Sequence, residues 1–138
     1  MSVKAVRQAL CDTISQYAER QVYTYKVVKE QGQFPAVIVE PDEADYVGDF
    51  GGSMTTWRFN VWVLCNGADL ETGQNDLDEF VDDIGPNSIP QILNTHSNLG
   101  IGAVDATVQR MKGYGGSFQW YGVPHVGALL VVDVIMPA

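Results

Sequence analysis

The stretch Met54-Thr-Thr-Trp-Arg-Phe-Asn-Val-Trp-Val-Leu-Cys65 is the strongest secondary-structure signal in the chain. Its side chains alternate between two faces with the period of a β-strand. The first face is apolar throughout and consists of Trp57, Phe59, Val61, Val63 and Cys65. The second face is polar up to Asn60 and becomes apolar at Trp62. We expect a long strand with its first face in the core. Trp62 is then covered either by a helix of the same chain or by another subunit.

A helix and two short strands are predicted before this stretch. Apolar residues spaced three and four apart predict an amphipathic helix over residues 2–19, with Ser2 as its N-cap. Strand-favouring residues predict strands over 21–26 and 34–41. Residues 41–53, which are rich in acids and glycine, carry the weakest signal for regular structure.

Two helices are predicted after it. An apolar stripe that ends at Ile84 predicts a helix over about 71–84, and Gly85-Pro86 then stops it. A short helix is expected over 88–94, with Ser88 as its N-cap.

The rest of the chain returns to strand patterns. Residues 104–112 alternate, Gly113-Tyr-Gly-Gly116 reads as a turn, and 118–121 form a short aromatic segment. Residues 126–136 are nearly all apolar, which predicts a central strand covered on both faces.

The element order predicts one α+β domain over residues 1–138. We expect a mainly antiparallel or mixed sheet, with the N-terminal helix and the second helix packed on it. The order is α-β-β-β-α-(α)-β-β. A chain of 138 residues and 15.1 kDa is long enough to bury a core without a metal or disulfide. No apolar run reaches the ~20 residues needed to span a bilayer, and Lys4, Arg7 and Asp12 argue against a signal peptide.

The charge balance is strongly acidic. There are 8 Lys and Arg against 17 Asp and Glu, a net charge of −9. Nucleic-acid binding draws on clustered Lys and Arg, and the chain has no basic run. The lack of a basic run argues against binding to DNA or to an anionic membrane. Repelling DNA or imitating it stays open.

No catalytic motif is present in the sequence. There is no nucleophile elbow, phosphate-binding loop or cluster with metal-ligand spacing around His96 or His125. Asp76-Leu-Asp78 resembles the start of a calcium loop but lacks the sixth-position glycine. We expect no enzyme activity, no cofactor and no metal, and we expect Cys11 and Cys65 to be reduced, partly buried thiols.

Several motifs occur together in one order. They are Phe34-Pro-Ala-Val-Ile-Val-Glu-Pro41, Asp45-Tyr-Val-Gly-Asp-Phe-Gly51, Trp57-Arg-Phe-Asn-Val-Trp-Val63, Gln74-Asn-Asp-Leu-Asp-Glu-Phe80, Ile89-Pro-Gln-Ile-Leu93, Gly113-Tyr-Gly115 and Gly122-Val-Pro-His-Val-Gly-Ala128. In their order and spacing, over essentially the whole chain, they resemble the tail terminator proteins of long-tailed, siphovirus-type actinobacterial phages. The sequence is also similar to the broader lambda-like tail-completion group, which shares the fold.

The resemblance implies a structural virion protein rather than an enzyme. Such proteins form a hexameric ring on the head-proximal end of the tail tube, where the ring stops tube growth and joins the head connector or head-closure protein. The implied partners are further copies of the chain, the tail tube protein and that connector. DNA passes through the ring without specific binding, and the implied location is the neck of the virion, reached from the host cytoplasm during assembly.

A closed ring needs two different and complementary contact surfaces on each subunit. The residues that we expect at a subunit or partner interface are Asp42, Glu43, Asp45, Tyr46, Asp49, Phe50 and Trp62. The acids that we expect to face the lumen or a partner are Asp76, Glu79, Asp82 and Asp83.

Three alternatives remain open from the sequence. The chain could be another structural protein of the tail, either a neck protein such as a head-closure or tail-completion protein, or the tail tube protein itself, although two amphipathic helices argue against the tube protein. It could be an acidic DNA mimic that inhibits a nuclease, although its acids cluster in one loop and one helix rather than in two rows. A small hydrolase would need a chance pairing of His125 with a carboxylate.

Overall fold

The computed structural model describes residues 2–26, 33–46, 54–67, 70–120 and 123–137. In these parts the chain forms three helices and five strands, in the order α-β-β-β-α-α-β-β. The predicted α+β class and element order are confirmed.

One sheet contains all the described strands. They are β1 (Tyr23–Tyr25), β2 (Ala36–Asp45), β3 (Met54–Asn66), β4 (Asp105–Trp120) and β5 (Val123–Pro137). Their order across the sheet is β1-β2-β3-β5-β4. β1 runs parallel to β2, whereas the pairs β2/β3, β3/β5 and β4/β5 are antiparallel. The sheet is therefore mainly antiparallel with one parallel pair at its edge.

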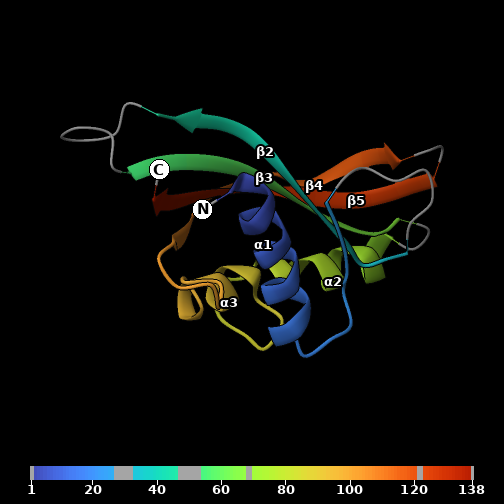
Figure 1. Cartoon of the computed structure of the whole chain (residues 1–138). Coiled ribbons are helices and arrows are strands. Elements are labelled where there is room, and N and C mark those ends of the chain that lie inside the picture. Colours follow the sequence, from blue (N-terminus) through green and yellow to red (C-terminus); the bar gives the residue numbers. More distant parts are fainter. Residues whose placement is uncertain (1, 27–32, 47–53, 68–69, 121–122, 138) are drawn as a thin grey trace.

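The three helices, α1 (Val3–Tyr17), α2 (Leu70–Val81) and α3 (Ile89–Thr95), lie on one face of this sheet (Figure 1). Their apolar stripes meet the sheet in one continuous core. Its helical members include Val6, Leu10, Ile14, Leu77, Phe80, Ile89 and Leu93. Among the described residues no helix lies on the other face of the sheet (Figure 1), and we call this face the open face.

Both predicted N-caps are confirmed. The Ser2 hydroxyl accepts a hydrogen bond from the Ala5 amide at 3.1 Å, and the Ser88 hydroxyl accepts one from the Gln91 amide at 3.1 Å. Each bond satisfies an amide that the first turn of a helix leaves without an intrahelical partner.

The predicted alternation along β3 is confirmed. Phe59, Val61, Val63 and Cys65 are fully buried on the helix side of the sheet. Trp57 is half-buried at the margin of the same core. Because β3 lies between β2 and β5, this row of side chains forms the middle of the core.

β2 is longer than predicted and reaches Asp45. A register shift between Pro41 and Glu43 marks a bulge, beyond which the strand still pairs with β3. A proline is tolerated there because β1 pairs with β2 only as far as Ile38, so this part of β2 has one paired side among the described residues. Residues 41–45 of the segment expected to be irregular therefore belong to β2. Residues 47–53 lie outside the described residues.

The turn expected at Gly113–Gly116 is wrong, because β4 continues through it. The register moves from Lys112 opposite Leu129 to Gly116 opposite Gly127, so the extra residues bulge out of the ladder. Gly113 and Gly115 adopt φ angles of 64° and 73°, which glycine reaches without strain. The glycines therefore bend one long strand instead of ending it.

Two expectations about apolar residues are also wrong. α2 ends at Val81, and Ile84 lies beyond it with 74% of its surface exposed. β5 is covered by helices on one face only, so Ile135 on the open face is 41% exposed. An apolar run does not reveal which face the helices will cover.

Gly73 allows α2 to approach the sheet closely. A Cβ atom at this position would collide with the carbonyl oxygen of Asn66 and lie 3.0 Å from Cγ2 of Val126. A glycine in a helix costs stability, and here it lets the helix backbone pack against the ends of β3 and β5.

Both cysteines are free and buried, which is deeper than the partial burial expected. Burial is the main cause that raises the pKa of Cys11 from 9.0 to about 11 and that of Cys65 from 9.0 to about 12. Folding therefore favours the protonated thiols.

We expect neither cysteine to react with a thiol reagent in the folded chain near neutral pH, and both to react after unfolding in urea. Because the pKa values are raised, the associated stability is complete below about pH 9 and is lost as the pH rises through the folded pKa values. Spectrophotometric thiol titration checks this, with Ser15→Cys on the exposed side of α1 as a reactive control. Rapid labelling of the native wild-type chain would contradict it.

Candidate subunit and partner interface

A row of charges crosses three strands on the open face of the sheet. The register places Arg58 of β3 between Glu43 of β2 and Asp133 of β5. Its Nε lies 3.0 Å from Oδ1 of Asp133, and its Nη1 lies 3.0 Å from Oε1 of Glu43. The hydrogen bond that Arg58 donates to Asp133 is the largest cause that raises the pKa of Arg58, and the charge of Glu43 adds a smaller effect. One cation is thus held between two carboxylates.

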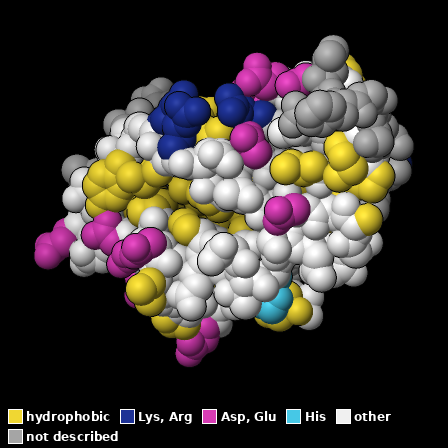
Figure 2. All heavy atoms as spheres, turned by 90° about the vertical axis from the view of Figure 1, so that its left-hand side faces the viewer, with side chains coloured by type: hydrophobic (Ala, Val, Ile, Leu, Met, Phe, Trp, Pro, Cys, Tyr) yellow, Lys and Arg dark blue, Asp and Glu magenta, His cyan; other side chains and the backbone are white. Residues whose placement is uncertain are grey.

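An open groove of about 650 Å³ lies at this end of the sheet. Its lining residues come from β2, β3 and β5 and from Tyr46 just after β2: Glu43, Ala44, Asp45, Tyr46, Thr56, Arg58 and Asp133. Tyr46 is 66% exposed, and its ring meets that of Trp57 edge-on with 6.0 Å between the centroids. Figure 2, which views the molecule from this end, shows acidic and basic side chains side by side along the top.

The structure brings together four of the residues predicted at an interface. Glu43, Asp45 and Tyr46 line the groove, and Asp42 is exposed next to them at the bulge of β2. Asp49 and Phe50 lie outside the described residues. The groove is acidic and shallow, so it suits contact with a cationic or aromatic protein surface more than enclosure of a small molecule.

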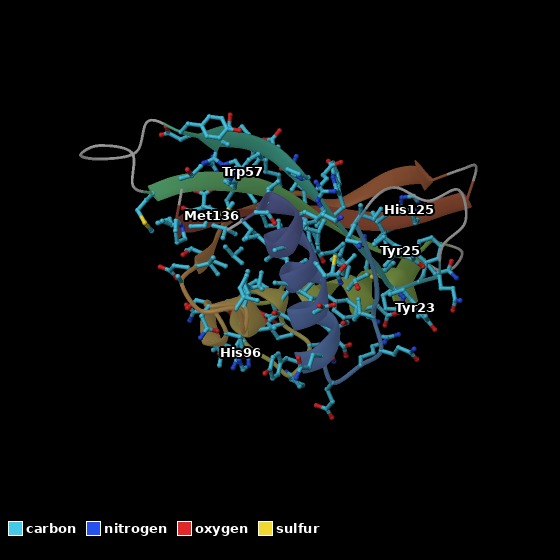
Figure 3. The ribbon with its side chains drawn as sticks, viewed as in Figure 1. Tyr23, Tyr25, Trp57, His96, His125 and Met136 are labelled. Atoms are coloured by element: carbon cyan, nitrogen blue, oxygen red, sulfur yellow. The ribbon has the colours of Figure 1, made fainter. Side chains whose placement is uncertain are left out.

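Trp62 lies on the same open face, farther along β3. It packs beside a small second cluster of Ala36, Ile38 and Leu64, together with Tyr25 and Phe34. Its indole Nε1 donates to Oε1 of Glu40 at 2.8 Å. Figure 3 places Trp57 and Tyr25 toward opposite ends of the sheet. Strand neighbours of its own chain, and not a helix, therefore half-bury Trp62.

The acids predicted to face a lumen or a partner differ in their surroundings. Arg20 reaches α2 and binds Asp76 with two hydrogen bonds, of 2.6 and 3.1 Å, and Glu79 with one of 3.4 Å. The hydrogen bond to Asp76 is the largest cause that raises the pKa of Arg20. Arg20 also lies 5.9 Å from the centroid of the Phe80 ring. Asp76 and Glu79 thus hold the segment after α1 against α2.

Asp82 and Asp83 follow the end of α2. The Asp82 carboxylate accepts a hydrogen bond from the Asp83 amide at 2.9 Å, and the Asp82 carbonyl accepts one from the Ser88 hydroxyl. Both side chains are exposed. Of the four acids, these two form no ion pair with a described residue. The Arg20 pairing could not be found from the sequence, because 56 residues separate Arg20 from Asp76.

The two histidines lie apart from this interface. His96 stacks on Tyr17 with 3.6 Å between ring centroids, and His125 is buried, 5.8 Å from the ring of Phe34. The described residues contain no group of three or more His, Cys, Asp or Glu side chains placed to hold a metal ion. Among the same residues no helix has the length and apolar character needed to cross a membrane.

Comparison of the sequence with models of known protein families finds no match, and comparison with curated proteins finds none either. The residues of the chain itself are therefore the basis for its proposed function.

We expect Asp76→Asn to lower the free energy of unfolding by about 1 kcal/mol, because it weakens a two-pronged ion pair at a half-buried site. Asp83→Asn, which removes the same charge from an exposed site, serves as the matched control and should change it by less than about 0.5 kcal/mol. Urea denaturation measures both. Equal effects of the two substitutions would contradict a structural role for Asp76.

Proposed function

We propose that this chain is a structural virion protein, the tail terminator of a long-tailed phage. Copies of it form a ring, hexameric by the resemblance, on the head-proximal end of the tail tube. The ring ends tube polymerisation and joins the tail to the head connector while DNA passes through. The protein acts in the neck of the virion and assembles in the host cytoplasm.

The observation that carries this proposal is the order of the motifs that resemble terminator proteins. The fold gives these motifs a common setting. Phe34–Pro41 and Trp57–Val63 supply the two adjacent strands β2 and β3, and Gln74–Phe80 supplies most of α2. These three motifs thus supply parts of two central strands and most of a helix that packs on them.

The described surface supports a role in protein contacts. The groove of Glu43, Asp45, Tyr46 and Arg58 is open and charged, and an exposed aromatic ring stands beside it. Exposed aromatic and arginine side chains are enriched where proteins bind one another. A net charge of −9 suits a channel through which DNA slides, because acidic walls repel phosphates.

The proposal is tested by negative-stain imaging of particles from an infection that lacks this gene. We expect unattached tails of irregular and excessive length beside full heads, because nothing ends polymerisation of the tube. Complementation with the wild-type gene should restore tails of uniform length, joined to heads.

Two other outcomes would contradict the terminator role. Tails of normal length beside unjoined heads would assign the protein to another joint of the neck, such as head closure. Normal virions would contradict a neck role altogether, and inhibition of a nuclease by the purified chain would then favour the DNA-mimic alternative.

A further inference from the structure

The strand β3 ends at an asparagine that is followed by a glycine. Asn66-Gly67 is the only asparagine–glycine pair in the sequence. β2 pairs with β3 only as far as Leu64, whereas β5 pairs with β3 as far as Asn66. Among the described strands, Asn66 therefore has a neighbour on one side only. A residue at such a strand end opens at a lower free-energy cost than a residue in the middle of a sheet.

The side chain of Asn66 and the backbone that follows it are accessible. The Asn66 side chain is exposed, and Gly67 is half-buried just beyond the strand. Rotation about ψ of Asn66 brings the amide nitrogen of Gly67 toward Cγ of the Asn66 side chain. Because glycine lacks a Cβ atom, it gives the backbone more freedom than any other residue and leaves its amide nitrogen less hindered. Position, exposure and the following glycine thus favour an attack of this nitrogen on the side-chain amide.

We propose that Asn66 is a site of spontaneous deamidation in the folded chain. The Gly67 nitrogen forms a bond to Cγ of Asn66, the bond from Cγ to Nδ2 breaks, and ammonia leaves with the proton of the Gly67 amide. The product is a five-membered succinimide, which water then opens. Cleavage of the bond between Cγ and the nitrogen gives aspartate, and cleavage of the bond between the main-chain carbonyl carbon and the nitrogen gives isoaspartate. This reaction is independent of the proposed neck role.

The isoaspartate product alters a contact between β3 and α2. The main-chain carbonyl group of Asn66 lies so close to Gly73 that a Cβ atom on Gly73 would collide with its oxygen. In isoaspartate the backbone continues through Cβ and Cγ, so it is one atom longer, and the former carbonyl group is a free carboxylate. A longer backbone and a new charge at this close approach weaken the packing of α2 on the ends of β3 and β5.

The packing of α2 matters for the whole domain. Leu77 and Phe80 of this helix are fully buried in the core, and Asp76 binds Arg20. The aspartate product keeps the normal backbone path, so it adds a charge but leaves the carbonyl group in place beside Gly73. The two products of one reaction therefore predict different stabilities.

The test starts from the folded wild-type chain, which is aged at physiological temperature and mildly alkaline pH. An alkaline pH favours loss of the Gly67 amide proton and so speeds the reaction. Peptide mapping by mass spectrometry then locates each lost side-chain amide over a time course. We expect the amide of Asn66 to be lost before that of Asn98, which is also exposed but is followed by Leu99. Asn98 thus serves as the internal control.

Two variants of the full chain separate the reaction from other changes on ageing. Gly67→Ala keeps Asn66 but adds a Cβ atom beside the attacking nitrogen. Asn66→Gln keeps an amide at the same position but would need a six-membered ring. We expect both variants to retain their amide over the period in which the wild type loses most of its Asn66 amide. Circular dichroism and melting temperature before ageing establish that each variant is folded.

The stability of the products is measured after the aged chain has been separated by ion exchange. We expect the isoaspartate form to melt at a lower temperature than the unmodified chain. The aspartate form and the variant Asn66→Asp, which share the normal backbone path, should melt close to the wild type.

Three results would overturn the proposal. Loss of the Asn66 amide only after unfolding in urea would mean that the folded strand end protects it. Equal rates of loss at Asn66 and Asn98 would remove the special role of Gly67. An isoaspartate form that melts with the wild type would overturn the assigned effect on α2.

Discussion

The packing of all three helices against one face of a single sheet is the constraint on which the rest of this structure depends. It buries Phe59 and Val61 of β3 completely, together with Leu77 and Phe80 of α2. It also leaves the opposite face without a helix in the part of the chain that the structure describes, so that polar groups can line it. The ion pairs of Arg58 and the small cluster beside Trp62 both depend on this one-sided arrangement. A sheet covered on both faces would have had no room for them.

In the same arrangement, some acidic side chains form ion pairs that hold the fold together and others remain exposed to solvent. Asp76 and Glu79 form ion pairs with Arg20 and hold the segment after α1 to α2, so Arg20 neutralises part of their charge within the molecule. Glu43 and Asp133 flank Arg58, where they order the end of the sheet. Asp42, Asp82 and Asp83 remain exposed.

The core pattern could be predicted from the sequence because it is local. The alternation from Trp57 to Cys65 defines which side of β3 is buried, and Ser2 and Ser88 mark the starts of their helices by a bond to an amide three residues on. The long β4 could not be predicted, since the glycines at 113 and 115 are equally typical of turns and of bulges. The choice between them depends on pairing with β5, which is a long-range contact.

The candidate interface was predictable in part for the same reason. An acidic segment with an exposed tyrosine is visible in the sequence, but Arg58 and Asp133, 75 residues apart, meet only in the folded sheet. Strand order, which periodicity does not reveal, decides which side chains become neighbours. Glu43, Arg58 and Asp133 form one row only because β2, β3 and β5 are adjacent in the sheet.

The most direct test of the proposed terminator ring is a cryo-electron microscopy reconstruction of the neck of intact virions that carry this gene. We predict a ring of copies of this domain on the last tier of the tail tube. A ring at that position built from some other fold, with no density for this domain in the neck, would contradict the account.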